Sequence, residues 1–215
     1  RHRPVYLGEK TLTGRFITFE GGEGAGKSTL VNLLASSLAR AGIKATVTRE
    51  PGGAPAAELI RELLLKGEPG RWDGINEALL MVAARRAHLT ATILPALAQG
   101  EWVVCDRFAD STTAYQGHGA GVPLASLSEL HKLIAGDLKP DLTLLLDLPV
   151  VEGLKRANGR GAPDRMEMEN AEFFERVRAG YRARAQANPQ RFRLIDSSRP
   201  LDAVLAQVRA TLSAY

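Results

Sequence analysis

Short, nearly continuous apolar runs recur along the chain. They occupy residues 16–20, 45–48, 102–106, 142–147 and 193–196. Runs with so little alternation of apolar and polar positions are typical of strands covered on both faces. Between them, apolar residues recur at helical spacing over residues 27–41, 58–65, 76–98, 124–135, 169–187 and 201–213. Strands that alternate with helices predict an α/β fold in three layers: a five-stranded parallel sheet with helices on both faces and right-handed crossovers.

Two stretches that contain glycine and proline interrupt this alternation and are predicted to be loops. One covers residues 67–74, and the other covers residues 157–163 and carries arginines. No linker divides the chain, so we expect a single domain over residues 15–215 after an N-terminal extension over residues 1–14. The extension lacks the apolar stretch of a signal peptide. No apolar run approaches the roughly 20 residues of a membrane span, so no membrane partner is expected.

Composition narrows the class of protein only slightly. The 215 residues are 45% apolar and 24% charged, which is ordinary for a soluble globular protein. Lysine and arginine exceed aspartate and glutamate by 28 to 24, a mildly basic balance that fits phosphorylated ligands or nucleic acid. Cys105 is the single cysteine, which excludes an intrachain disulfide and a cysteine-rich zinc site and suits a cytoplasmic location.

The most informative motif lies between the first apolar run and the first helix. Residues 21–28 read Gly-Gly-Glu-Gly-Ala-Gly-Lys-Ser, which fits the pattern G-x-x-x-x-G-K-[ST]. In such a loop, backbone N–H groups converge on phosphate oxygens, the lysine reaches the β- and γ-phosphates and the serine binds Mg²⁺. The predicted nucleoside triphosphate site, in which Lys27 and Glu23 are assigned catalytic roles, consists of Gly21, Gly22, Glu23, Gly24, Ala25, Gly26, Lys27, Ser28 and Thr29.

A metal-binding acid is expected at the end of a strand near this loop. Asp106 ends the run 102–106 and is followed by Arg107. We therefore predict that Asp106 joins Ser28 at the Mg²⁺ site. Asp147 ends the run 142–147 and is the alternative acid.

Arginines gather at or near the carboxyl ends of the predicted strands. Arg49 and Glu50 close the second strand, Arg107 follows the third, and Arg61 lies on the helix after the second. A small kinase needs a second anion site of this kind, because phosphoryl transfer depends on positioning and charge neutralisation. Arg85 stands inside an otherwise apolar helix, where a buried charge needs a partner.

Three strings occur in a fixed order with the loop at 21–28. Residues 48–53 read Thr-Arg-Glu-Pro-Gly-Gly, residues 106–117 read Asp-Arg-x-x-x-Ser-x-x-Ala-Tyr-Gln-Gly, and an arginine-rich loop ends in Asp164-Arg165. Together they resemble bacterial thymidylate kinase (dTMP kinase), a P-loop nucleoside monophosphate kinase, from about residue 15 to the C-terminus. The resemblance implies the strand order 2-3-1-4-5 and transfer of the γ-phosphoryl group of ATP to dTMP, which gives dTDP and ADP with Mg²⁺.

The resemblance also assigns roles to residues of the acceptor site. Arg107 and Arg61 match the arginines that hold the dTMP phosphate, and Arg107 is also counted as catalytic. Glu50 matches the acid beside the acceptor and its sugar. Ser111 belongs to the same Asp-Arg motif and is placed in the substrate site.

For the base and sugar, the resemblance implies a second set of contacts. Arg85 matches the arginine that reads the thymine edge, and Thr112 and Gln116 match positions that hydrogen-bond the base. Tyr115 matches the tyrosine beside the sugar, where a 2′-hydroxyl would collide. Met81 stands near the place where the family has an aromatic residue against thymine, and it is a polarisable substitute.

The arginine-rich loop resembles the family's lid, at about residues 156–166. A lid excludes water and brings charge to the transferred phosphoryl group. The residues at the variable positions of the loop 21–28 include no arginine, so this charge is expected from Arg156, Arg160 or Arg165. Arg160, between two glycines, is favoured as the catalytic contact, and Arg156 and Arg160 are assigned to ATP.

Several further arginines, three histidines and Cys105 are predicted to have no role in binding or catalysis. Arg176, Arg178, Arg182 and Arg184 fall on one helix with acids upstream, which favours a solvated face over a nucleic-acid contact. His88, His118 and His131 have no metal-ligand spacing and are interpreted as incidental. Cys105 is expected to be a buried apolar side chain.

The function that these residues predict is phosphorylation of dTMP by ATP and Mg²⁺ in a homodimeric enzyme, with the helix 78–98 as a possible interface. The alternative is a P-loop kinase for another nucleotide or for a deoxynucleoside, in which Glu50 acts as the base. A P-loop ATPase that works on nucleic acid is a second alternative. A binding module without catalysis is a third.

Overall fold

Within residues 12–159 and 165–213, which the computed structural model describes, five strands form one sheet. Their order is β2-β3-β1-β4-β5 and every neighbouring pair is parallel, so the predicted sheet and its implied order are confirmed. The strands are β1 (Phe16–Glu20), β2 (Ala45–Arg49), β3 (Trp102–Asp106), β4 (Leu142–Asp147) and β5 (Phe192–Asp196).

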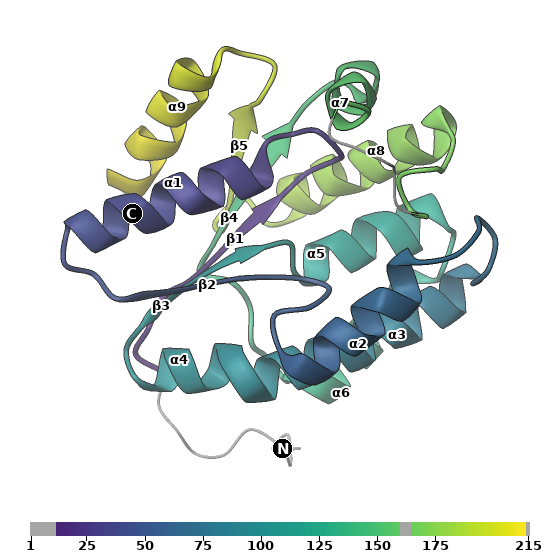
Figure 1. Ribbon diagram of the computed structural model, residues 1–215, viewed down its shortest axis with the longest axis horizontal. Helices are drawn as coiled ribbons and strands as arrows, with labels where there is room; N and C mark the ends of the chain where they lie inside the picture. Colours follow the sequence, from purple (N-terminus) through teal and green to yellow (C-terminus); the bar gives the residue numbers. More distant parts are fainter. Residues whose placement is uncertain (1–11, 160–164, 214–215) are drawn as a thin grey trace.

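Helices cover both faces of the sheet, as predicted (Figure 1). One face carries α1 and α9, and the other carries α4, the π-helical segment before it, and α8. The helical elements are α1 (Lys27–Arg40), α2 (Pro55–Leu65), α3 (Gly74–His88), η1 (Leu89–Ile93), α4 (Leu94–Ala98), α5 (Ala109–Thr112), η2 (Thr113–Gly119), α6 (Leu124–Ala135), α7 (Val150–Ala157), α8 (Ala171–Ala187) and α9 (Leu201–Ser213).

Alternate side chains of the strands supply the two apolar cores. Ile17 and Phe19 pack with α1 and α9, whereas Phe16 packs on the opposite face with η1 and α4. The Thr18 hydroxyl, fully buried between strands, is 3.0 Å from the hydroxyl of Thr143 on β4. Cys105 is fully buried, as predicted.

The predicted helix 76–98 is divided into three segments. The N–H of Leu94 bonds to Leu89 O, five residues earlier, which widens the turn in front of Pro95. Proline has no N–H and its ring clashes with the carbonyl four residues before it, so a wider turn accommodates it. The helices that follow Arg107 and Pro149 were not predicted, since α5 and α7 are too short to give a clear apolar period.

Residues at the start of the described chain belong with the sheet domain. The N–H groups of Thr13 and Gly14 both donate to Leu97 O, at 3.2 and 3.0 Å. A side chain at Gly14 would collide with the carbonyl oxygen of Glu101. The last two residues assigned to the N-terminal extension are therefore packed against the end of α4. None of the helices in the described ranges combines the length and apolar character that membrane crossing requires.

Candidate functional site

The loop between β1 and α1 leaves the first turn of α1 open to an anion. Gly26 is the N-cap of α1, has a φ of 90°, and offers no side chain to the first N–H groups. No acidic residue stands in this first turn. Gly24 has a φ of 68°, and a Cβ there would collide with the carbonyl oxygen of Gly153 on α7. The free N–H groups and the positive end of the helix dipole therefore suit a phosphate.

Lys27 is folded back against this loop. Its Nζ donates to the carbonyl oxygens of Gly21 and Gly22, at 3.1 and 2.8 Å. Burial, with a further contribution from the nearby Arg107, lowers the pKa of Lys27 to about 8. The two carbonyls hold the ammonium at the loop, where the negative charge of a phosphate would compensate for the hydration that burial removes.

Ser28 and Asp106 form a pair of oxygen ligands at the ends of the loop and of β3. Ser28 Oγ donates to Asp106 Oδ2 at 2.7 Å. Asp106 Oδ1 is buried and accepts no hydrogen bond from the described residues. Mg²⁺ takes oxygen ligands and is bound by one or two protein groups together with phosphates and waters, so this pair fits it. The described residues contain no group of three or more His, Cys, Asp or Glu that would hold a metal by themselves.

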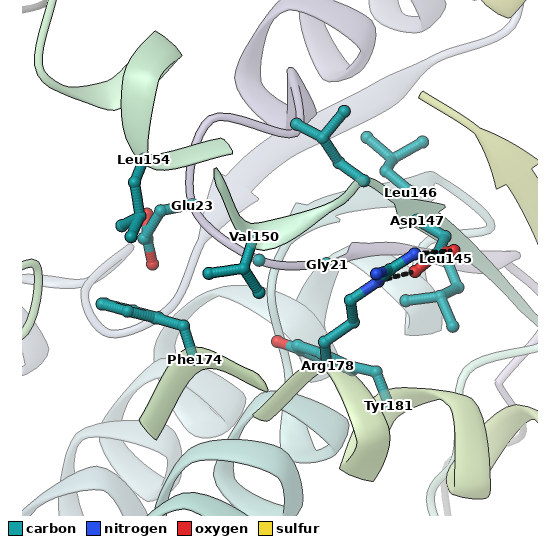
Figure 2. Close-up of a pocket in the computed structure, with 12 residues that line it drawn as sticks. Gly21, Glu23, Leu145, Leu146, Asp147, Val150, Leu154, Phe174, Arg178 and Tyr181 are labelled. Carbon is teal, nitrogen blue, oxygen red and sulfur yellow. Dashed lines mark hydrogen bonds and ion pairs between the residues drawn. The ribbon is translucent and has the colours of Figure 1, made fainter. Parts of the chain in front are cut away.

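Asp147, the alternative acid, is engaged by arginines of α8. Arg178 donates to both of its carboxylate oxygens, at 2.8 and 2.9 Å, and Arg182 lies 3.5 Å away. Figure 2 shows the Arg178–Asp147 pair beside a small cavity behind the loop, of about 20 Å³. This ion pair occupies the oxygens that a metal would need, which leaves Asp106 as the better ligand.

Arg107 lies between the phosphate-binding loop and η2. It has a φ of 68°, and it is the one residue other than glycine with a positive φ among the described residues. Its guanidinium donates to Glu23 Oε1 at 2.6 Å, to Gly21 O at 3.0 Å and to Tyr115 Oη at 3.1 Å. A non-glycine residue in this conformation is strained, and such strain concentrates at functional sites.

A cavity of about 240 Å³ joins the loop to the predicted acceptor residues. Its lining includes Leu65, the Arg49 side chain, and Met166 and Glu167 after the arginine-rich loop. The predicted site residues that line it are Glu23, Gly24, Ala25, Gly26, Lys27, Ser28, Glu50, Arg61, Met81, Asp106, Arg107, Ser111 and Tyr115. The structure thus gathers the phosphate-binding loop and both predicted acceptor arginines around one space.

The predicted base-reading residues lie outside the lining of this cavity. Arg85 is 2% exposed, and its Nε donates to Glu50 Oε2 at 2.7 Å, so the buried arginine has the partner that the sequence required. Its Nη2 donates to Thr112 Oγ1 at 2.9 Å. Gln116 is fully buried and donates to Glu77 Oε2 at 3.0 Å. Their roles toward the base stay predictions. Of the loop residues, Gly21 and Gly22 line the smaller cavity and Thr29 is exposed.

His88 is not incidental, contrary to the prediction. It is fully buried, with Nε2 2.6 Å from Thr48 Oγ1 and Nδ1 3.1 Å from Glu50 Oε1. Glu50 is thereby held by both His88 and Arg85, one helical turn apart on α3. The spacing of three residues between Arg85 and His88 was the signal in the sequence that could have joined them.

The described ends of the arginine-rich loop are anchored. Arg156 donates to Ser197 O at 3.0 Å, which places it beside the loop after β5. Arg165 is 1% exposed; it donates to Leu64 O at 2.9 Å and lies 2.7 Å from Glu77 Oε1. Arg165 is therefore a buried structural residue. The favoured residue, Arg160, lies outside the described residues, in the range 160–164.

The prediction of a solvated arginine face on α8 is only partly right: Arg176 and Arg182 are exposed, but Arg178 and Arg184 are half-buried in ion pairs. Arg176 donates twice to Gly119 O, Arg178 pairs with Asp147, and Arg184 pairs with Asp110 at 2.9 Å. These arginines tie α8 to η2, β4 and α5. The sequence concealed this because the partners lie at least 30 positions away in the chain.

Glu20, at the end of β1, was missed as a site residue. It is fully buried and accepts hydrogen bonds from Phe108 N at 2.8 Å and from Ser111 Oγ at 2.6 Å. Burial, and then the charge of Asp110, raises the pKa of Glu20 from 4.5 to about 8. An acid as the last residue of a buried strand was the available signal in the sequence, since buried acids need partners.

This buried acid predicts an unusual dependence of stability on pH. The pKa of Glu20 is higher in the folded protein than in the unfolded chain, so its contribution to stability is complete below about pH 4.5 and is lost as pH rises to about 8. Glutamine at this position cannot ionise. The difference in free energy of unfolding, Glu20→Gln minus the unaltered protein, should therefore increase by a few kcal/mol between pH 5 and pH 8. It should stay at that higher value at pH 9.

Urea unfolding at pH 5 to 9 measures this difference. Glu129→Gln, on the exposed side of α6, is the matched control, and its difference from the unaltered protein stays constant over the same range. A difference for Glu20→Gln that does not vary with pH contradicts the raised pKa.

Comparison with known proteins gives one consistent result. The family model described as thymidylate kinase matches residues 19–208. A thymidylate kinase of Nitrobacter winogradskyi is 52% identical over 202 residues, which cover 93% of this chain and 88% of the relative. One of Teredinibacter turnerae is 49% identical over 204 residues, with 95% and 100% covered. The crystal structure of thymidylate kinase from Ehrlichia chaffeensis superposes with a TM-score of 0.77 at 36% identity, over 93% of this chain and 98% of that one.

Proposed function

The chain belongs to the thymidylate kinase family and phosphorylates dTMP, and we propose that ATP, bound with Mg²⁺ at the loop 21–28, is the phosphoryl donor. The observation that carries this proposal is the cavity of about 240 Å³, which Lys27 lines together with Arg107 and Arg61. A donor site and an acceptor site for anions thereby face the same space. The alternative kinases are not favoured by the family match.

The donor side follows from the residues of the loop. The open N-terminus of α1 and Lys27 hold the triphosphate, and Ser28 and Asp106 are the residues that would hold Mg²⁺. When bound, Mg²⁺ neutralises charge on the phosphate oxygens. The dTMP phosphate oxygen attacks the γ-phosphorus in line, which gives dTDP and ADP without a covalent enzyme intermediate.

The acceptor side is assigned to the arginines across the cavity. Arg107 and Arg61 bind the dTMP phosphate and offset its repulsion from ATP. Glu50 is held by Arg85 and His88, both buried, which opposes its use as a base for a nucleoside hydroxyl. Tyr115 borders the sugar, with Ser111 beside it, and Met81 lines the cavity on the side of α3.

The base and lid contacts complete the proposed site. We assign Arg85, Thr112 and Gln116 to the thymine edge, where side-chain movement on binding would bring them to the cavity. Arg160 is assigned to the transferred phosphoryl group and Arg156 to ATP. A closed lid excludes water, which keeps ATP from being hydrolysed.

ADP formation from ATP and Mg²⁺ with a panel of acceptors tests the function. The panel is dTMP, dUMP, dCMP, dGMP, AMP, UMP and thymidine. We expect strong selectivity for dTMP. Turnover of thymidine in preference to dTMP would move the acceptor to a nucleoside and make Glu50 the base. ADP formation that no acceptor raises, but that a polynucleotide stimulates, would replace the kinase by a nucleic-acid-dependent ATPase.

We also propose a cytoplasmic homodimer. Most apolar side chains of the helix 78–98 are buried in the core, so that helix as a whole is not a free surface. Exposed apolar residues instead gather on three helices that pack side by side, α2, α3 and α6 (Figure 1). These residues are Leu59, Leu63, Ile75, Leu79, Leu124 and Leu133.

A charge on the central helix of this surface tests the dimer. We expect Leu79→Glu, at a side chain that is 49% exposed, to convert a dimer into a monomer at micromolar concentration, because a buried unpaired carboxylate is unfavourable. Sedimentation equilibrium measures the mass. Val151→Glu, on the distant α7, is the matched control and leaves the mass unchanged. A monomeric unaltered protein, or a dimeric Leu79→Glu, contradicts the assignment.

A further inference from the structure

The two terminal nitrogens of the Arg107 guanidinium have different partners. Nη1 donates to Gly21 O and to Tyr181 Oη, both at 3.0 Å, and more weakly to Ser111 Oγ at 3.4 Å. Nη2 donates to Glu23 Oε1 and to Tyr115 Oη, at 2.6 and 3.1 Å. Glu23 and Tyr115 line the large cavity, whereas Tyr181 does not. An entering phosphate therefore competes with the partners of Nη2, and the bonds to Nη1 stay on the protein side.

Tyr181 comes from α8, far from the catalytic motifs in the sequence, and is held in place by several contacts. It is 1% exposed, and its ring packs edge-on against that of Tyr115. Its hydroxyl lies 2.7 Å from Ser111 Oγ and donates to Glu20 Oε2 at 3.2 Å. Figure 2 shows Tyr181 and Arg178 projecting from α8 toward the loop that carries Gly21. The hydroxyl is thus fixed before any ligand arrives.

Glu20, which accepts the hydrogen bond from Tyr181, also restrains the backbone next to Arg107. Glu20 Oε1 accepts from Phe108 N at 2.8 Å, and Arg107 N donates to Phe19 O at 2.9 Å. These bonds hold both peptide groups around the positive φ of Arg107. Glu20 therefore restrains the start of the Arg107 side chain directly and its end through Ser111 and Tyr181.

We propose that Tyr181, supported by Glu20 and Ser111, is a positioning residue that presets the Arg107 guanidinium for the acceptor phosphate and thereby sets the preference of the site for a nucleotide over a nucleoside. The inference rests on the proposed role of Arg107. Preorganisation of this kind strengthens binding because less rotamer freedom is lost when the ligand enters. The Tyr181 hydroxyl contacts Arg107, Ser111 and Glu20, whereas the sugar-side Tyr115 packs on the Tyr181 ring.

The test compares two ligands that differ by the phosphate alone. The dissociation constant of dTMP and that of thymidine are measured by titration calorimetry for the unaltered protein, Tyr181→Phe and Arg107→Ala. Phenylalanine keeps the ring and its packing and removes the hydroxyl. We expect Tyr181→Phe to weaken dTMP about tenfold, as loss of a bond to a charged group does, and to leave thymidine and ATP unchanged. Arg107→Ala weakens dTMP further.

A remote variant separates positioning from general structure. Thr211→Val removes a hydroxyl bond on the remote α9 and changes neither ligand.

Equal weakening of dTMP and thymidine by Tyr181→Phe would reduce Tyr181 to a packing residue and overturn the proposal. An unchanged dTMP affinity in Tyr181→Phe, with a loss in Arg107→Ala, overturns it while the role of Arg107 stands. An unchanged dTMP affinity in Arg107→Ala would show that Arg107 does not contact the phosphate. It would overturn both the proposed role of Arg107 and the positioning role of Tyr181.

Discussion

Replacement of Arg107 by alanine is expected to lower kcat/KM for dTMP about 10³-fold, or by about 4 kcal/mol of transition-state stabilisation. Arg107 lines the cavity with Lys27 and Ser28. In the proposed mechanism, its charge lies where the acceptor phosphate would meet the triphosphate. Without it, two anions approach each other with less neutralisation, and the deficit grows as the phosphoryl group moves between them. Initial rates of ADP formation at varied dTMP measure the loss.

Arg107→Lys separates charge from geometry. Lysine keeps a point charge but cannot bind a phosphate with two parallel N–H donors, so we expect a loss between that of alanine and none. Arg209→Ala, on the exposed side of α9, is the matched control and keeps the full rate. Thermal unfolding shows whether each variant is folded, since Arg107 also bonds Glu23 and Tyr181. A loss below tenfold in a folded Arg107→Ala contradicts the proposed role.

Patterns that are local in the sequence predicted the fold well. Each of the five strands lies within one residue of its predicted bounds. The central strands β1, β3 and β4 are largely buried and leave continuous apolar runs. The edge strands β2 and β5 have exposed positions, so the prediction that they are covered on both faces is wrong. The phosphate-binding loop was also predicted from a local pattern, because its motif consists of consecutive residues. The prediction of one regular helix over residues 76–98 is wrong at Leu89–Ile93, where the apolar spacing continues but the backbone forms a wider π-helical turn before Pro95.

Contacts between distant segments explain what the sequence left out of the site. Tyr181 lies 161 positions from Glu20, and no spacing rule joins them. The arginines of α8 had the pattern of a solvated face, yet two of them pair with Asp147 at the end of β4 and with Asp110 on α5. Residues within one motif could be assigned to phosphate binding from the sequence, and that assignment stays a prediction, whereas the groups that orient them come together only in the tertiary fold.

Substitution of Asp110 by alanine is expected to lower the free energy of unfolding by about 3–5 kcal/mol. Asp110 is 1% exposed, and Arg191 donates to both of its oxygens, at 2.7 and 2.8 Å, while Arg184 donates to Oδ1 at 2.9 Å. Alanine leaves the charge of Arg191 buried beside Thr143 without a counter-ion. Urea unfolding at pH 7 measures the loss.

The pH dependence and a second substitution identify the cause of this loss. Burial alone would raise the pKa of Asp110, but the hydrogen bonds and charges of Arg191 and Arg184 hold it below its ordinary value. The ionised Asp110 therefore stabilises the fold fully above about pH 3.8, and this contribution is lost as pH falls through the lower folded-state pKa. The difference in free energy of unfolding between Asp110→Ala and the unaltered protein should therefore become smaller in acid. Asp110→Ala/Arg191→Met removes the stranded charge as well, and it should recover part of the loss because an apolar pair of similar volume is tolerated where a lone ion is not. The single variant Arg191→Met completes the comparison. If its loss of stability and that of Asp110→Ala simply add in the double variant, the two side chains stabilise the protein independently. The ion pair between α5 and the residue before β5 then does not hold these segments together.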